Sequence, residues 1–160
     1  MFREMRRKKQ QMSDAECIAV LERASSGVLA VHGDGGYPYA VPLSYVYADG
    51  KIYFHCAKTG HKLDAIRADG RVSFCVIDRD EIVQEEFTTH FRSVIVFGRA
   101  AVVEDPVEKY KVLRRLAEKY SPDMPKAAAD REIDDGLPAV CIVGITAEHM
   151  TGKAAKELME

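Results

Sequence analysis

The sequence has no tryptophan, no long apolar run and no surplus of charge of one sign. No stretch approaches the roughly 20 apolar residues that a membrane-spanning helix needs, so we expect no membrane segment. The chain carries 23 basic and 25 acidic side chains, so it offers no general basic field to nucleic acid. Its 160 residues are enough to bury one core, and we expect a single domain over residues 1–160.

Cysteine is scarce and shows no paired spacing. The four cysteines are Cys17, Cys56, Cys75 and Cys141, and no C-x-x-C motif occurs. Two of them, Cys75 and Cys141, stand in apolar strand-like runs, where free buried thiols are the usual state. This usage favours a reducing, cytoplasmic location.

Several catalytic motifs are also missing. The five histidines form no H-E-x-x-H motif and no paired Cys/His spacing, so we expect no metal centre. Neither a Walker loop nor a dinucleotide-binding G-x-G-x-x-G motif is present. A Ser-His-Asp triad lacks the nucleophile-elbow pattern that would support it. The chemistry must therefore be sought in other features of the chain.

Local signals predict two to four short helices at the periphery. Ser13 opens a capping box at the start of the first helix. Residues 61–68 place apolar side chains on one side of a short helix. Asp105 and Pro106 fit the N-cap and first position of a clear amphipathic helix. Residues 151–158 predict a short tail helix.

Three polar segments are expected to lie outside the regular elements. Residues 1–12 predict an exposed basic arm. The carboxylate clusters at 78–81 and 85–86 are more typical of a solvated loop than of an acid–base pair. The polar, proline-bearing residues 121–136 predict a surface loop.

Six apolar runs predict β-strands. They cover residues 28–31, 39–48, 51–57, 71–77, 91–103 and 138–146. Asp49 and Gly50, between the second and third runs, are a strong hairpin signal. Pro42 indicates an irregular or edge position, and Gly98 indicates a bulge or a close approach. Tight turns and short helices join the runs, so we expect an antiparallel, closed or nearly closed small barrel, with a sandwich as the alternative.

The turn that follows the hairpin is unusually basic. Residues 53–62 read YFHCAKTGHK, and His61 and Lys62 fall in the first turn of the predicted helix. Cations oppose the helix dipole there, whereas a bound phosphate would compensate them and would also use the Thr59 hydroxyl. The alternative is that both side chains are simply solvated, at a cost of a few tenths of a kcal/mol.

Five stretches together resemble a known family. They are YPYAVPLSYVY, DGKIYFHCAKTGHK, RVSFCV, EEFTTHFRSVIVFGRA and EHMTGKAAKEL. Their combination is similar to the nitroimidazole-resistance (Nim) type of flavoprotein, within the pyridoxamine 5'-phosphate oxidase-like, FMN-binding split-barrel superfamily. The resemblance implies a mostly β, six-stranded antiparallel split β-barrel. It also implies a homodimer with FMN, or FAD as the alternative, bound at the subunit interface.

Carried over by position, the resemblance implies four cofactor-contacting groups in one chain and one residue from the partner. They are Val41, Pro42, Leu43 and Ser44 beside the isoalloxazine and ribityl chain, His55 and Cys56 at the ring edge, Lys58, Thr59, His61 and Lys62 at the phosphate, Arg92 and Ser93 at the pyrimidine end, and Lys153 from the partner subunit. Relatives usually carry arginine at position 61, and a neutral imidazole attracts phosphate less strongly.

The resemblance implies a flavin-dependent reductase of small aromatic acceptors such as 5-nitroimidazoles, reduced by a nicotinamide or another donor. His55 is the candidate catalytic residue, because an imidazole can donate a proton or a hydrogen bond near neutral pH; the alternative is a packing and cofactor-contact role. A pyridoxine-type vitamer oxidase is disfavoured, because the tail lacks the expected Trp-Arg-rich, Arg-x-His signature. A non-catalytic flavin- or haem-binding protein remains the other alternative.

Overall fold

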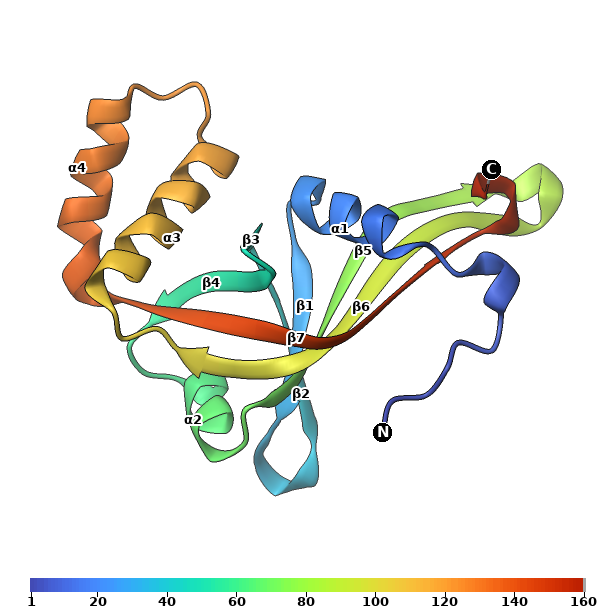
Figure 1. The fold of residues 1–160 in the computed structure, drawn as a ribbon, viewed down its shortest axis with the longest axis horizontal. Coiled ribbons are helices and arrows are strands. Elements are labelled where there is room, and N and C mark those ends of the chain that lie inside the picture. The colour runs from blue at the N-terminus through green and yellow to red at the C-terminus, as the bar shows by residue number, and fades with distance from the viewer. Residues whose placement is uncertain (160) are drawn as a thin grey trace.

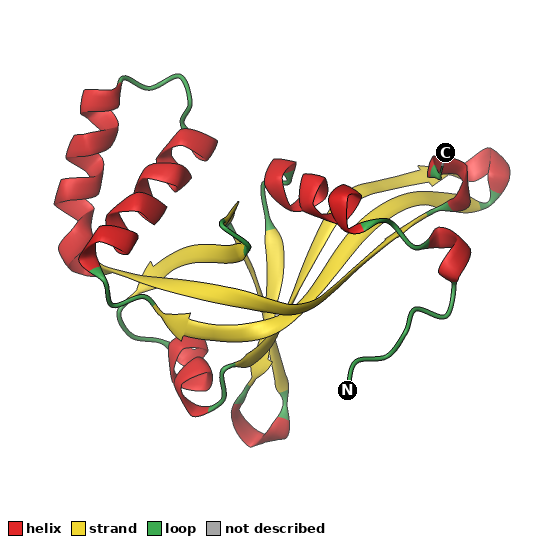
Figure 2. Cartoon of the chain, in the orientation of Figure 1, coloured by secondary structure: helices red, strands yellow, loops and turns green. Residues whose placement is uncertain are grey.

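Alternating apolar side chains build one antiparallel sheet, which with four α-helices makes up most of the chain (Figures 1 and 2). The computed structural model describes residues 1–159. Its strands are β1 (Gly27–His32), β2 (Pro38–Leu43), β3 (Val46–Ala48), β4 (Lys51–Ala57), β5 (Arg71–Val83), β6 (Thr88–Val102) and β7 (Val140–Ala154). They are ordered β2-β1-β5-β6-β7-β4-β3. Every pairing is antiparallel, which confirms the predicted mostly-β, antiparallel architecture.

The strand count differs from the prediction because one expected strand is broken. The run at 39–48 forms β2 and β3, which are interrupted at Ser44 and Tyr45. These two strands are the opposite edges of the sheet, yet only two residues connect them. The connection spans at most about 11 Å, so the sheet must curl until its edges approach. No ladder joins β2 to β3 in the described part of the chain, and the sheet is therefore seven-stranded and curled but not closed.

Tyr45 fixes this break from both sides. Its ring is fully buried, and its hydroxyl donates to the carbonyl of Leu21, 2.7 Å away. The Tyr45 backbone N–H donates to the Tyr120 hydroxyl over 2.9 Å, and the Tyr45 carbonyl accepts from Lys119 Nζ over 3.0 Å. The Tyr120 hydroxyl can then donate its own proton to the Ser25 carbonyl, 2.7 Å away. Side chains thus replace the ladder bonds that the broken strand loses.

The core lies on the concave face of the curled sheet. Phe54, Phe74, Val94 and Val143 are fully buried there, because alternate residues of each strand point inward. Helix α1 (Asp14–Arg23) covers this face with Cys17, Val20 and Leu21. A second, smaller core forms where α3 (Pro106–Tyr120) packs on the outer face of β3, β4 and β7, through Val112, Leu116, Ile142 and neighbours.

Two glycine positions behave as the sequence predicts. Asp49 and Gly50 have φ values of 53° and 76°, the left-handed pair of a two-residue hairpin between β3 and β4. At Gly98 the register with β7 shifts, and an added Cβ would lie 2.3 Å from the Thr146 carbonyl oxygen. Both the bulge and the close approach expected at Gly98 are confirmed.

Three predicted helix starts are confirmed. The Ser13 backbone N–H donates to the Glu16 carboxylate over 2.6 Å, and the Glu16 backbone N–H donates to Ser13 Oγ over 3.3 Å. Helix α2 covers His61–Ala68 as expected. At α3, the Asp105 carboxylate accepts from the Val107 N–H over 3.3 Å, and proline occupies the first turn.

Two predicted segments that follow α3 are wrong. Residues 121–136 are not a loop, because α4 (Lys126–Gly136) follows Pro125 and pairs with α3 as a helical hairpin (Figure 1). Its alanine-rich start favours a helix more strongly than its polarity favours a loop. Residues 151–158 are not a helix, because β7 runs on to Ala154, and only Lys156–Leu158 form a 3₁₀ turn. Pairing with β6 overrides the local helix preference there.

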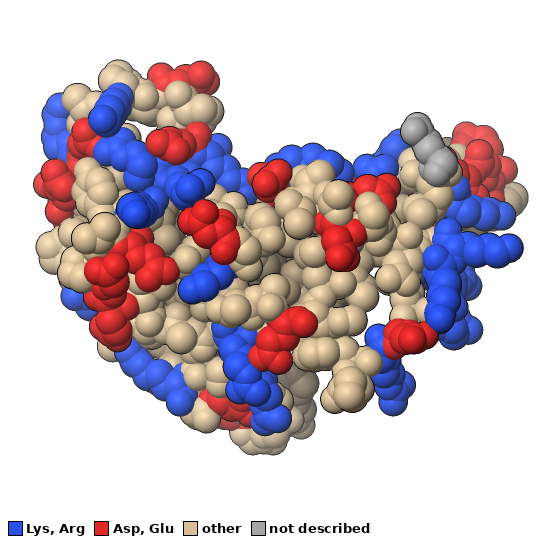
Figure 3. Space-filling view, in the orientation of Figure 1, with Lys and Arg blue, Asp and Glu red and all other residues tan. Residues whose placement is uncertain are grey.

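The basic arm at residues 1–12 is exposed along most of its length, as predicted, but its end is attached to the sheet. Gln11 forms a bridge with Lys153, and the Met12 N–H donates to the Gly152 carbonyl over 2.9 Å. The Phe2 ring stacks on His149 with the centroids 4.8 Å apart. Basic side chains gather at the end of the molecule where the N-terminal arm lies (Figure 3).

The Tyr120→Phe variant tests the role of the Tyr45 contacts. It leaves the Tyr45 N–H and the Ser25 carbonyl without their shared partner, so the free energy of unfolding should fall by about 1–3 kcal/mol. Urea titration followed by circular dichroism measures the change. The control is Tyr37→Phe, because Tyr37 is 79% exposed; its effect should stay within about 0.5 kcal/mol. Equal stability of the two variants would show that the hydroxyl does not hold the break.

Candidate functional site

The turn between β4 and α2 presents unpaired backbone donors. Gly60 is the N-cap of α2 at φ 144°, a conformation that side chains rarely adopt. The Leu63 and Asp64 N–H groups donate to the Gly60 carbonyl. For the N–H groups of His61 and Lys62, no hydrogen-bond acceptor is found within residues 1–159, and no side chain caps the helix. This first turn is therefore both basic and uncapped, and an anion could satisfy it.

His61 is held in place beside this turn by a residue that the sequence did not single out. Its ring lies against Tyr39 of β2, with the centroids 4.2 Å apart and the planes tilted by 35°. Its Nε2 atom is 3.8 Å from the carboxylate of the exposed Asp34. Lys58 and Thr59 are exposed, so their side chains are accessible to a ligand at the turn.

His55 and Cys56 point to opposite faces of β4. Cys56 turns inward beside Cys141 of β7 and packs against the main core. Burial raises the pKa of the Cys56 thiol to about 11, and Cys141 adds to this rise, while Lys62 and Arg67 oppose it. Cys56 is therefore a neutral thiol at pH 7 rather than a nucleophile. His55 turns outward and is exposed.

Ser44 and His55 meet in a cavity of about 640 Å³ between the outer face of the sheet and the α3–α4 hairpin. Ser44 reaches it because the strand breaks at this residue, and His55 reaches it from β4. The remaining wall is mainly apolar and consists of Leu113, Leu116, Ala117, Tyr120, Ser121, Met124, Ala128, Ala129, Glu132, Ile133, Gly136 and Val140. The sequence did not predict this cavity, because residues 121–136 were expected to form a loop.

The β2 residues of the predicted site lie on an edge strand. Val41 and Leu43 are half-buried against the main core, and Pro42 is exposed on the opposite face, across from Val28. The edge position predicted for Pro42 is confirmed. Because β2 pairs only with β1 among the described strands, the backbone groups on its other edge are free to meet a ligand.

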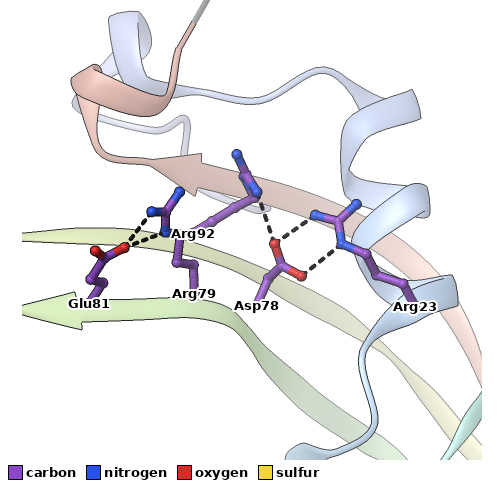
Figure 4. A network of polar contacts seen from close by, with 5 residues as sticks. All are labelled: Arg23, Asp78, Arg79, Glu81 and Arg92. Atoms are coloured by element: carbon purple, nitrogen blue, oxygen red, sulfur yellow. Dashed lines mark hydrogen bonds and ion pairs between the residues drawn. The ribbon is translucent and has the colours of Figure 1, made fainter.

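Arg92 belongs to a polar network with Asp78, a residue of the 78–81 cluster that was expected to lie in a loop (Figure 4). Asp78 lies on β5, not in a loop, and its side chain is only 11% exposed. It accepts two bonds from Arg23, of 2.9 and 2.6 Å, and one of 3.1 Å from Arg92. The bond from Arg23, with a smaller effect of Arg92, lowers the pKa of the Asp78 carboxyl. Because long-range strand pairing creates this site, no local sequence signal could have revealed it.

The predicted site residues fall into two groups within one chain. Ser93 and Lys153 face each other across β6 and β7, next to Arg92. The end of α2 meets β6 much farther along, where the Ala100 N–H donates to the Gly70 carbonyl. Arg92 and Ala100 are separated by about 25 Å of extended strand. The second group therefore lies well away from the α2 turn in the same chain.

Two further observations bear on the chemistry. Within residues 1–159, no group of three or more His, Cys, Asp or Glu side chains is arranged to hold a metal ion. None of the helices in that range is both long enough and apolar enough to cross a membrane.

Comparison with known proteins gives a family-level match. The family model described as pyridoxamine 5'-phosphate oxidase matches residues 13–154, which is most of the chain. Among curated proteins, none matches this sequence.

Three solved structures share the fold. A conserved hypothetical protein from Mycobacterium tuberculosis is 25% identical, with a TM-score of 0.82 over 96% of this chain and 92% of that one. An FAD-binding protein from Mesorhizobium loti is 28% identical, with a TM-score of 0.62 over 91% and 97%. A candidate 5-nitroimidazole antibiotic resistance protein from Bacteroides thetaiotaomicron is 20% identical, with a TM-score of 0.75 over 89% and 85%.

The Asp78→Asn variant tests the network around Arg92. The native pKa of Asp78 is lowered, so its charge stabilises the fold above the unfolded pKa of about 3.9 and stops doing so as pH falls through the native value. At pH 7 the variant should lose about 1.5–3 kcal/mol of unfolding free energy. The loss should shrink below about pH 4, as urea titrations at several pH values would show. The exposed Asp80→Asn serves as control, and a pH-independent deficit would contradict the charge-based account.

Proposed function

Because the chain belongs to the pyridoxamine 5'-phosphate oxidase family, we propose that it is a flavoprotein that binds FMN at the turn before α2. The uncapped, basic first turn of α2 carries this proposal. Two free N–H groups, the Lys62 ammonium and the Thr59 hydroxyl are available to a single phosphate. His61, braced by Tyr39, adds a further donor.

The residues beside the turn suit the rest of the cofactor. From the turn, the free edge of β2 offers backbone groups along Val41, Pro42 and Leu43 for the ribityl chain and the ring. Ser44 and His55 then lie where the ring would end. When bound, FMN supplies the electron transfer, while these residues orient it and exclude water. His55 donates a proton or hydrogen bond to the acceptor from its exposed position on β4.

An apolar outer face of the sheet supports the proposal of a homodimer with a split-barrel fold in each subunit. Val28, Cys75 and Ile95 stand in register across β1, β5 and β6 and point away from the core. Ile77 and Phe97 continue this face and are 62% and 39% exposed. A row of outward apolar side chains on neighbouring strands is typical of a protein interface. A second copy of the chain would cover it.

The dimer also accounts for the two separated groups of site residues. Arg92, Ser93 and Lys153 lie too far along the sheet from the α2 turn to serve the same flavin in one chain. In a two-fold dimer the partner's copies of these residues reach the cofactor instead. Asp78 then holds the Arg92 guanidinium in a fixed orientation within its own subunit.

We infer a Nim-type reductase activity, in which a nicotinamide or another donor reduces the bound flavin and a small aromatic acceptor receives the electrons. The apolar cavity beside His55 and the likeness to the Bacteroides protein support this reading. A flavin carrier without turnover is the second candidate, and the 28% identical FAD-binding protein from Mesorhizobium loti favours it. FAD is accordingly the alternative cofactor.

Lys62→Ala tests the phosphate site. The variant loses one charge-assisted hydrogen bond, so its affinity for FMN should fall by about 1.5–3 kcal/mol. Fluorescence titration of flavin-free protein with FMN measures the affinity. The matched control is Lys111→Ala on the exposed side of α3, which should bind FMN as the wild type does.

The same preparations test the activity. The wild type should be yellow and should oxidise a reduced nicotinamide faster when a 5-nitroimidazole is added. Flavin binding without turnover, for every donor tried, would favour the carrier. A colourless protein that takes up neither FMN nor FAD would refute the proposed function.

Ile95→Glu tests the interface. A buried carboxylate in the apolar row should drive the dimer apart, because an unpaired charge cannot be desolvated cheaply. Analytical ultracentrifugation should show a folded monomer, with FMN affinity reduced because the partner's residues are lost. Val107→Glu places the same charge on an apolar residue of α3 that is 61% exposed, and it should leave the dimer intact. A dimer that survives Ile95→Glu would place the interface elsewhere.

A further inference from the structure

The cavity under the α3–α4 hairpin is kept open by small side chains. Ala128 and Gly136 stand eight residues apart on the side of α4 that lines the cavity, and Ala129 stands beside Ala128. Opposite, Ala117 of α3 is equally short. Protein interiors are normally packed without large voids. Beside the contacts of α3 with the sheet, a cavity of about 640 Å³ instead remains, within the usual range of about 300–1,000 Å³ for small-molecule sites.

The polar side chains of this cavity lie on both sides, with the potential donors His55 and Ser44 on the sheet and the acceptor Glu132, together with Ser121, on the helical hairpin. Within residues 1–159, the His55 side chain forms no hydrogen bond to protein, and Ser44 is exposed. The Tyr120 hydroxyl already accepts a hydrogen bond from the Tyr45 N–H and donates one to the Ser25 carbonyl. A ligand would therefore place its hydrogen-bonding edge toward His55 and Ser44 and its apolar surface toward the helices.

The charges of the wall restrict the ligand further. Glu132 contributes a carboxylate, and no lysine or arginine is among the lining residues of the described chain. A phosphate ester would have to be desolvated next to this carboxylate without a cationic partner, which is costly. Neutral molecules avoid that cost. The cavity thus differs in its chemistry from the cationic turn at α2.

We propose that the α3–α4 cavity binds a neutral, planar aromatic molecule with a hydrogen-bond-accepting edge, and that this molecule is the electron acceptor of the proposed flavin reaction. This assignment rests on the proposed function, because the acceptor must reach the flavin ring beside His55. The same lining excludes one class of ligand. Pyridoxine-type vitamers that carry a phosphate are excluded by the absence of a cation and the presence of Glu132.

Two small probes of different charge test the proposal. Menadione is a neutral quinone, and pyridoxal 5'-phosphate carries a phosphate. Calorimetric titration of the flavin-loaded wild type should show binding of menadione and at least about tenfold weaker binding of pyridoxal 5'-phosphate. Ala129→Leu should weaken menadione binding by about tenfold or more, because even one methylene changes affinity on that scale in an apolar pocket. Ala127→Leu is the control, because Ala127 is exposed and lies outside the lining.

A reversal of charge gives an independent test. Glu132→Arg supplies the missing cation without an amine that could form an imine with the aldehyde, so it should raise the affinity for pyridoxal 5'-phosphate while leaving FMN affinity unchanged. In the wild type, menadione should shift the methyl resonances of Ala128 and Ala129 but not that of Ala127. This measurement needs no variant and therefore does not depend on whether Ala129→Leu folds.

The outcomes separate this proposal from the flavin assignment. If menadione binds Ala129→Leu as tightly as the wild type, or leaves the Ala128 and Ala129 methyl resonances unmoved, the cavity is not the acceptor site even if FMN binds normally. Tighter binding of pyridoxal 5'-phosphate than of menadione would overturn the charge argument. Failure to take up any flavin would instead refute the proposed function.

Discussion

The structure depends on how one buried tyrosine holds a broken strand. The sheet can curl only if β2 and β3, its opposite edges, are joined without a ladder between them. Tyr45 makes this feasible because its backbone N–H donates to the Tyr120 hydroxyl and its backbone carbonyl accepts from Lys119. Its own hydroxyl donates to the Leu21 carbonyl. Each of these groups would cost about 1–3 kcal/mol if it were buried without a partner.

The same break creates the candidate site. Regular pairing through position 44 would have kept Ser44 in the edge strand, whereas the break turns it toward the α3–α4 cavity. The contacts of Tyr120 and Lys119 also anchor the end of α3 to the sheet, and α3 is one wall of that cavity. Curvature of the sheet, placement of the helical hairpin and access to His55 are therefore consequences of one local arrangement.

What could be predicted from the sequence was encoded within a few residues. The capping box at Ser13, the Asp49-Gly50 hairpin and the start of α3 at Asp105 each need only their neighbours, and all three are confirmed. Two of the failures involve distant partners, whereas α4 was missed although its alanine-rich start is a local signal. Asp78 is buried by α1 and β6, and β7 extends beyond position 146 because β6 pairs with it. The basic turn at Lys62 was found because cations in the first turn of a helix oppose the helix dipole. The α3–α4 cavity breaks no such local rule, so nothing in the sequence pointed to it.

The charge distribution explains why a single chain would keep two such different sites side by side. An anionic cofactor end requires the free N–H groups and cations of the α2 turn, and those groups would bind any phosphate that reached them. The lining of the α3–α4 cavity contains no lysine or arginine and includes Glu132, so phosphate esters would favour the turn and neutral rings the cavity. The two proposed sites would therefore be selective against each other's ligand. On this proposal, a phosphorylated cofactor would not block the acceptor site, and a neutral acceptor would not displace the cofactor from the turn.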